Sequence, residues 1–182
     1  LALTDNTPLG VWSSSNNAIA TVDAAGLVTG LAEGTVTIYY TLTDSGCSTA
    51  VSHVIDVRSP VLISTHPTPQ SAIAVLGLFD ATFTVAASGT GITYQWEESV
   101  ASGPYAPIAN GGIYSGADSN TLVITQGPAS MNGNTYRCVV TGTSPCPAEI
   151  SNDALLTVGS TSITSNPQNV NLCDSGTASF TV

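Results

Sequence analysis

Basic residues are almost absent from this sequence. It has no lysine, Arg58 and Arg137 are its only arginines, and its 12 Asp and Glu residues give a net charge of -10. Binding to nucleic acid requires several Lys or Arg side chains that displace counterions from phosphates, so this partner class is close to excluded. The same deficit argues against anionic membrane surfaces and against chemistry that needs a lysine, such as Schiff-base formation.

Long apolar runs and helical periodicity are also missing. No run approaches the about 18 residues of a membrane span, so membrane insertion is not expected. The first residues, LALTDNTPLG, lack the basic start and apolar core of a signal peptide. Either a signal was removed or this is an internal stretch. The lack of lysine, the abundance of Thr, Ser and Gly, and the four cysteines together favour an extracellular location.

What the sequence does contain is a series of short runs rich in Val, Ile, Thr and Tyr, bounded by Gly, Asn, Asp and Pro. These runs recur about every ten residues, which is typical of antiparallel β-sandwiches. The pattern predicts strands near residues 19–22, 27–29, 35–43, 49–57, 80–88, 91–99, 120–126, 134–142 and 152–158. The segment RSPVLISTHPTPQ has three prolines, which break strands, and predicts a domain boundary near Arg58 to Pro60.

The first part of the chain contains the elements W-S-S-S-N, A-T-V-D, G-L-V-T-G and A-E-G-T-V-T-I, in this order. With these elements, residues 1–58 resemble a bacterial Ig-like domain of group 2. The resemblance implies that the first strand of the family would precede Leu1. It also implies a structural role for Trp12, which begins the first element.

The second part contains ITYQWEES, GGIYSGADSNTLVIT and MNGNTYRCVV. With these motifs, residues 59–159 resemble an immunoglobulin-like repeat of giant secreted surface proteins of Bacteroidetes, and residues 160–182 resemble the first strands of a further, incomplete repeat. The fold class implied is all-β, as tandem immunoglobulin-like antiparallel β-sandwiches. Trp96 is expected as the core tryptophan, and Tyr136 as a tyrosine corner whose hydroxyl bonds back to the chain. Phe83 stands where the usual cysteine of the second strand would be.

This resemblance leaves Cys138 without its usual partner, and Cys146 is the nearest candidate across a hairpin. Cys47 and Cys173 then look like halves of disulfides whose partners lie before Leu1 and after Val182. A Cys146 to Cys173 bond across a domain junction is the alternative. Zinc would need paired Cys or His ligands at short spacings, which this sequence lacks.

No catalytic constellation can be assembled from the motifs. Glu97 and Glu98 are adjacent on a predicted strand, so they face opposite sides, and we interpret them as solvated strand-edge charges. The two histidines are interpreted as structural or exposed. No enzyme activity, cofactor or metal is expected, although calcium binding at a domain junction is left as an alternative. Among the aromatics, Tyr105 is the candidate contact for a sugar, whereas Tyr114 is expected to pack within the repeat.

The function predicted is that of a non-catalytic spacer or stalk repeat in a large adhesin or filament at the cell surface. Its expected partners are neighbouring Ig-like repeats of the same chain, filament subunits that donate a strand, and surface glycans. The alternative is a carbohydrate-binding accessory module of a secreted polysaccharide-degrading enzyme, with Tyr105 at the contact surface.

Overall fold

A computed structural model describes residues 1–3, 10–161, 177 and 179 of this chain. The regular structure of these residues is almost entirely β, and their one short 3-10 turn is η1 (Ala129–Met131). No helix in this described part is long and apolar enough to cross a membrane. The predicted third repeat, residues 160–182, lies almost wholly outside the described residues.

The first Ig-like domain is built on a three-stranded sheet in the order β1 (Val11–Ser14), β4 (Gly34–Asp44) and β5 (Cys47–Val57). A second small sheet pairs β2 (Ala20–Val22) with β3 (Val28–Gly30). Side chains from both sheets meet in a core of Ala20, Val28, Val36 and Ile38. The strands predicted near residues 35–43 and 49–57 are confirmed as parts of β4 and β5.

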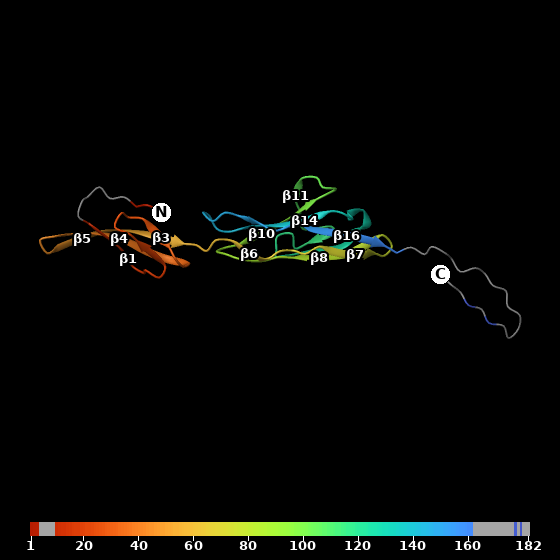
Figure 1. Ribbon diagram of the computed structural model, residues 1–182, viewed down its shortest axis with the longest axis horizontal. Helices are drawn as coiled ribbons and strands as arrows, with labels where there is room; N and C mark the ends of the chain where they lie inside the picture. The colour runs from red at the N-terminus through yellow and green to blue at the C-terminus, as the bar shows by residue number, and fades with distance from the viewer. Residues whose placement is uncertain (4–9, 162–176, 178, 180–182) are drawn as a thin grey trace. The chain divides into compact units, whose positions relative to one another are not determined.

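Trp12 packs against this core, with its ring centroid 4.7 Å from that of Tyr40. The hairpin of β4 and β5 continues beyond the core (Figure 1). The exposed fraction of Val51 is therefore 62%, although Ile55 further along the same strand packs on the core. Within β5, therefore, only residues near its end, such as Ile55, pack against the core of the first domain.

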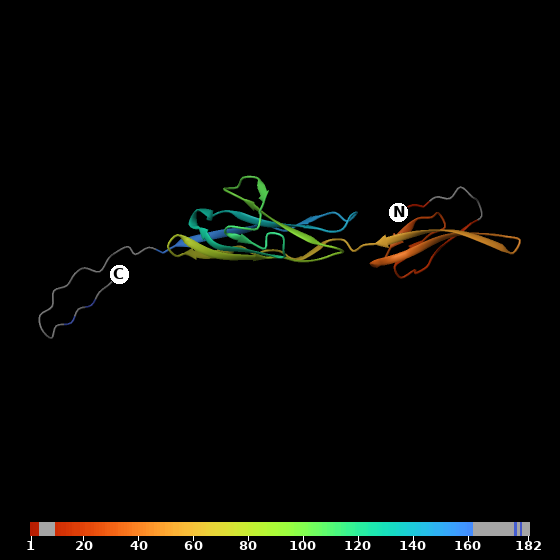
Figure 2. The same cartoon turned by 180° about the vertical axis from the view of Figure 1, so that it is seen from behind.

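The second domain has two facing sheets. The larger sheet has the order β11 (Tyr105–Pro107), β10 (Thr93–Ser99), β14 (Thr135–Thr141), β16 (Ala154–Ser160) and β7 (Gln70–Ala74), with β15 (Glu149–Ile150) beside β14. The smaller sheet has the order β12 (Tyr114–Ser115), β13 (Thr121–Pro128) and β8 (Leu78–Thr84). A further pair joins β6 (Leu62–Thr65) to β9 (Ala86–Ser88). The hairpin that contains β11 projects from this sandwich in both views (Figures 1 and 2).

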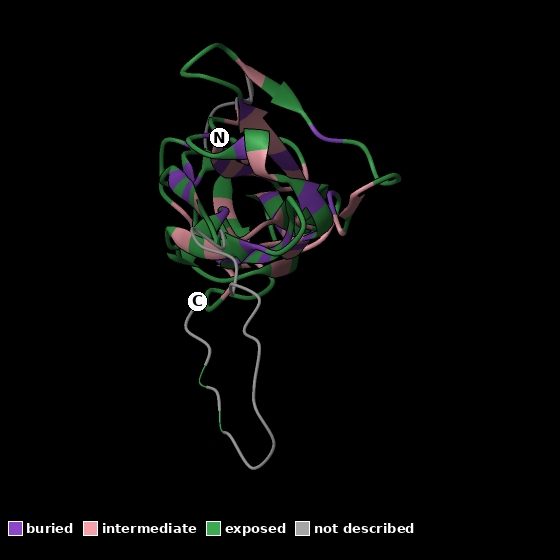
Figure 3. Cartoon of the chain, turned by 90° about the vertical axis from the view of Figure 1, so that its right-hand side faces the viewer, coloured by how far each residue is buried: buried purple, intermediate pink, exposed green. Residues whose placement is uncertain are grey.

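The core of the second domain follows from alternation along its strands. In β8 and β14 every second side chain is buried, as a pleated strand between core and solvent requires. Figure 3 colours the ribbons by whether each residue is buried, intermediate or exposed. Phe83 of β8, Trp96 of β10 and Tyr136 of β14 are all fully buried. The rings of Phe83 and Tyr136 stack at 4.6 Å, and Phe83 lies 6.3 Å from Trp96, so one aromatic cluster connects the two sheets.

The described chain divides into two compact units. The first is Leu1–Thr65 with Ala86–Tyr94 and Val139–Ile150, and the second is His66–Val85 with Gln95–Cys138 and the described residues from Ser151 onward. The unit border passes through β10 and β14 rather than through the connection near Arg58. The domain boundaries expected from the sequence, 1–58, 59–159 and 160–182, stay predictions.

Replacing Phe83 with Ala should destabilise the second domain by about 3 to 5 kcal/mol, because it removes a fully buried ring and leaves a cavity between the sheets. Urea denaturation measures this loss, followed by the fluorescence of Trp96 in a Trp12→Phe background. Ile73→Ala, at a side chain that is 63% exposed, is the control and should change stability by less than about 0.5 kcal/mol. A loss below about 1 kcal/mol for Phe83→Ala would show that this cluster does not hold the sheets together.

Candidate functional site

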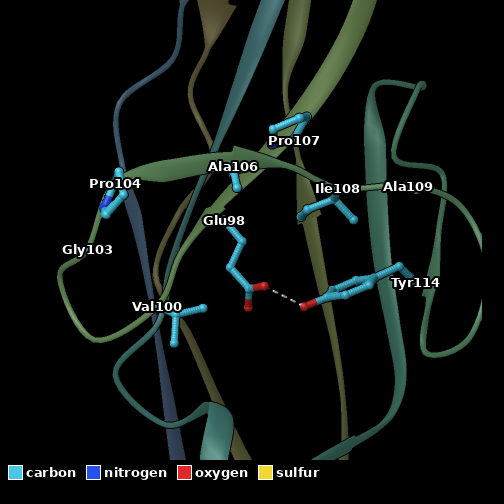
Figure 4. Close-up of a pocket in the computed structure, with 9 residues that line it drawn as sticks. All are labelled: Glu98, Val100, Gly103, Pro104, Ala106, Pro107, Ile108, Ala109 and Tyr114. Atoms are coloured by element: carbon cyan, nitrogen blue, oxygen red, sulfur yellow. Dashed lines mark hydrogen bonds between the residues drawn. The ribbon is translucent and has the colours of Figure 1, made fainter.

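A surface pocket lies where the hairpin of β10 and β11 folds over the sandwich (Figure 4). Its volume is about 340 Å³, and its walls are mainly apolar. The lining residues are Glu98, Val100, Gly103, Pro104, Ala106, Pro107, Ile108, Ala109 and Tyr114. Glu98 supplies the only charged side chain in this set, so the chemistry of the pocket depends on its carboxylate.

The Glu98 carboxylate is held by three hydrogen-bond donors. The Tyr136 hydroxyl donates to Oε1 at 2.6 Å, and the Asn134 side-chain amide donates to the same oxygen at 2.8 Å. The Tyr114 hydroxyl donates to Oε2 at 2.9 Å, as the dashed line in Figure 4 marks. Asn134 is buried and Tyr136 is fully buried, so the carboxylate is fixed from the core side. The two tyrosine bonds join β10 to β12 and β14.

Both tyrosines of this cluster are held in the protonated form. Burial raises the pKa of Tyr136, and the hydrogen bond to Glu98 raises it further. Burial also raises the pKa of Tyr114, with the charge of Glu98 as the second cause. A phenol with a raised pKa donates its proton in a hydrogen bond and does not act as a base at neutral pH. The cluster therefore positions the carboxylate and provides no proton acceptor of its own beyond Glu98.

The opposite face of β10 carries a separate polar group. Arg137 Nε lies 2.8 Å from Glu97 Oε2, and the guanidinium carbon lies 3.8 Å from the centroid of the Tyr105 ring. The Tyr105 hydroxyl is hydrogen-bonded to that of Thr135 at 3.0 Å, and burial raises the pKa of Tyr105. One face of the predicted sugar contact is thus covered by Arg137. A glycan role for Tyr105 stays a prediction.

The two glutamates lie on opposite faces of β10, as predicted. Their interpretation as solvated strand-edge charges is wrong. The side chain of Glu97 is only 18% exposed and is paired with Arg137, and Glu98 accepts bonds from three side chains. These partners lie on other segments of the chain, which the local sequence of β10 does not reveal.

Trp96 is fully buried, and its indole N–H donates to the carbonyl oxygen of Ser119 at 2.9 Å. Tyr136 is buried in the same aromatic cluster, but its hydroxyl bonds the Glu98 carboxylate rather than the backbone expected for a tyrosine corner. The difference arises because Glu98 on the neighbouring strand is a stronger, charged acceptor within reach.

No disulfide joins the three described cysteines, so the predicted Cys138 to Cys146 bond is not confirmed. The side chain of Cys138 points into the core, where burial raises its pKa to about 11. Cys146 is half-buried in a loop, with its thiol 3.6 Å from the carbonyl oxygen of Ser59. Cys47 is exposed at the start of β5, and Cys173 lies outside the described residues, as does its alternative bond to Cys146.

Within the described residues, no three His, Cys, Asp or Glu side chains gather as a metal site would require. His53 is exposed, and Nδ1 of His66 accepts the backbone N–H of Asn152 at 3.1 Å. Every buried side-chain nitrogen and oxygen in the described part has a hydrogen-bond partner. The polar groups of the sandwich are thus engaged in holding its structure.

Comparisons with known proteins agree with this fold. Residues 3–52 match the family of bacterial Ig-like domains of group 2. Extracellular domains 3–5 of Drosophila OTK share 19% identity over 83% of this chain and 52% of theirs, with a TM-score of 0.55. An E-to-A variant of titin domains I67–I69 shares 14% identity over 84% of this chain and 56% of its own, also with a TM-score of 0.55.

These likenesses show the fold alone, and the chain spans about half the length of the two solved structures. No curated protein matches the sequence. The described part of the chain therefore has the fold of Ig-like β-sandwiches, and residues 3–52 match the model of the bacterial group 2 family.

Replacing Tyr136 with Phe removes one donor from Glu98 and should lower stability by about 1.5 to 3 kcal/mol, as expected for a bond to a charged group. Tyr105→Phe is the comparison variant, because the Tyr105 hydroxyl bonds the hydroxyl of Thr135 at 3.0 Å. Tyr105→Phe should lower the free energy of unfolding by about 0.5 to 1.5 kcal/mol. Urea denaturation of both variants makes the comparison, and an equal loss in the two would contradict a special role for the Glu98 cluster.

Proposed function

We propose that this chain is a non-catalytic spacer or stalk repeat of a large extracellular adhesin or filament of the Bacteroidetes type. Ig-like domains are commonly extracellular repeat modules and are generally non-catalytic. The observation that carries the proposal is the parallel pairing of β7, near the start of the second domain, with β16, its last described strand.

This pairing suits a chain under tension. The register runs from Leu156 opposite Gln70 to Ser160 opposite Ala74, and both strands point the same way. When the two ends of the domain are pulled apart, parallel terminal strands slide along each other and all their hydrogen bonds are loaded together. An antiparallel terminal pair pulled from its open end would lose them one after another. The second domain therefore has the strand arrangement of a load-bearing link.

The surface chemistry supports the same function. The net charge of -10 opposes collapse and self-association of neighbouring repeats. The buried polar side-chain atoms of the described part all have hydrogen-bond partners, as suits a domain that serves as a stable link. The expected partners are neighbouring repeats and filament subunits, and the expected location is the cell surface.

One residue in the pairing of β7 with β16 allows a direct test of this mechanical role. The Leu156 N–H donates to the Asn134 carbonyl, and the Val158 N–H donates to the Asn132 side chain, so both point away from β7. Backbone groups of successive residues in a strand point in opposite directions. The N–H of Thr157, between them and opposite Ser71, therefore points toward β7.

Thr157→Pro removes this N–H and should markedly lower the force at which the second domain unfolds when single molecules are stretched from their ends. Thr157→Ala is the matched control, since it alters the side chain and keeps the N–H. Equal unfolding forces for the two variants would contradict a mechanical role of the β7 and β16 pairing. The contour length gained on unfolding assigns each force peak to its domain.

A further inference from the structure

The carboxylate of Glu98 has no arginine or lysine partner among these 182 residues. Arg137 is bound to Glu97, and Arg58 lies 3.8 Å from Asp56, so neither arginine contacts Glu98. No lysine occurs anywhere in the sequence. The three described groups that bind Glu98 are all neutral donors. The negative charge at the pocket is therefore not compensated by the described residues around it.

The geometry leaves one acceptor position of this carboxylate unused. An ionised carboxylate offers about four acceptor positions, two on each oxygen. Oε1 accepts bonds from Tyr136 and Asn134, whereas Oε2 accepts that of Tyr114. The carboxylate lies in the pocket between Val100 and the Tyr114 ring (Figure 4). The remaining position on Oε2 can accept a single donor that enters the pocket.

The walls of the pocket suit an alkyl chain. Val100, Pro104 and Ala106 are exposed side chains of the hairpin, and Ile108 forms a buried wall. The volume of about 340 Å³ is near the lower end of the range for ligand pockets, so there is room for the alkyl part of one side chain. A long side chain can lay its methylene groups on such walls while its charged end reaches a polar group.

We propose that this pocket binds a primary ammonium group at the end of an alkyl chain, presented as a lysine side chain by a partner segment outside these 182 residues. A compact ammonium needs only one acceptor from the carboxylate, whereas a guanidinium binds best through two parallel bonds. Occupation of Oε1 by two donors therefore favours lysine over arginine. A second copy of these 182 residues cannot supply the group, because they contain no lysine. The net charge of -10 would attract a cationic partner.

The probe for the test is n-butylammonium chloride, titrated into the whole 182-residue chain and followed by two-dimensional ¹H–¹⁵N NMR. The neutral alkyl alcohol 1-pentanol and n-butylguanidinium chloride serve as comparison probes. We expect saturable shifts at Val100, Ala106 and Ile108 with butylammonium, with a dissociation constant on the order of millimolar. Butylguanidinium should bind at least about threefold more weakly, and 1-pentanol should cause no saturable shift.

Glu98→Gln should weaken butylammonium binding at least about tenfold, since it removes the charge and keeps the size of the side chain. Glu97→Gln is the matched control: it removes the neighbouring charge on the opposite face of β10 and should leave the dissociation constant unchanged. If Glu98→Gln fails to fold, the comparison of the three probes on the unaltered chain tests the proposal instead. Equal shifts with 1-pentanol, preferred binding of the guanidinium, or shifts spread over all acidic surfaces would overturn the proposal.

Discussion

The stacking of Phe83 on Tyr136 is the contact on which the second domain depends. The two rings come from opposite sheets and lie 4.6 Å apart, with the buried Trp96 in the same cluster. In the immunoglobulin fold a disulfide between these sheets is usual. Here Phe83 fills the position on β8 that a cysteine would need, opposite a β14 whose Cys138 faces the core. Apolar contact between aromatic rings thus takes the place of a covalent bond between the sheets.

The aromatic cluster also determines where the polar site forms. Tyr136 has its ring in the core and its hydroxyl at Glu98, so the same side chain that joins the sheets also orients the carboxylate. That carboxylate faces the pocket beneath the projecting hairpin, while the terminal strands β7 and β16 pair elsewhere in the larger sheet. A load carried along these strands and a ligand bound at the hairpin would therefore use different parts of one sandwich.

Local alternation made much of the fold predictable, because the buried positions of β4, β8 and β14 follow a period of two that can be read within each segment. The strand β7 and the short strands β1, β11, β12 and β15 were not predicted. The candidate site was not predicted for a different reason. Glu98 meets Tyr114 and Tyr136 across 16 and 38 residues of sequence, so its partners become visible only when the sheet is assembled. The alternation placed Glu97 and Glu98 on opposite faces correctly, but it carried no sign of what each face would meet.

Packing and hydrogen bonds hold the second domain together, and among the described residues no disulfide joins its two sheets. Hydrogen exchange of the backbone amides of β14, measured by mass spectrometry with and without a reductant, tests this claim most directly. We predict the same protection for residues 135–141 under both conditions. Faster exchange in the presence of reductant would show that a disulfide supports the sandwich and would contradict the claim.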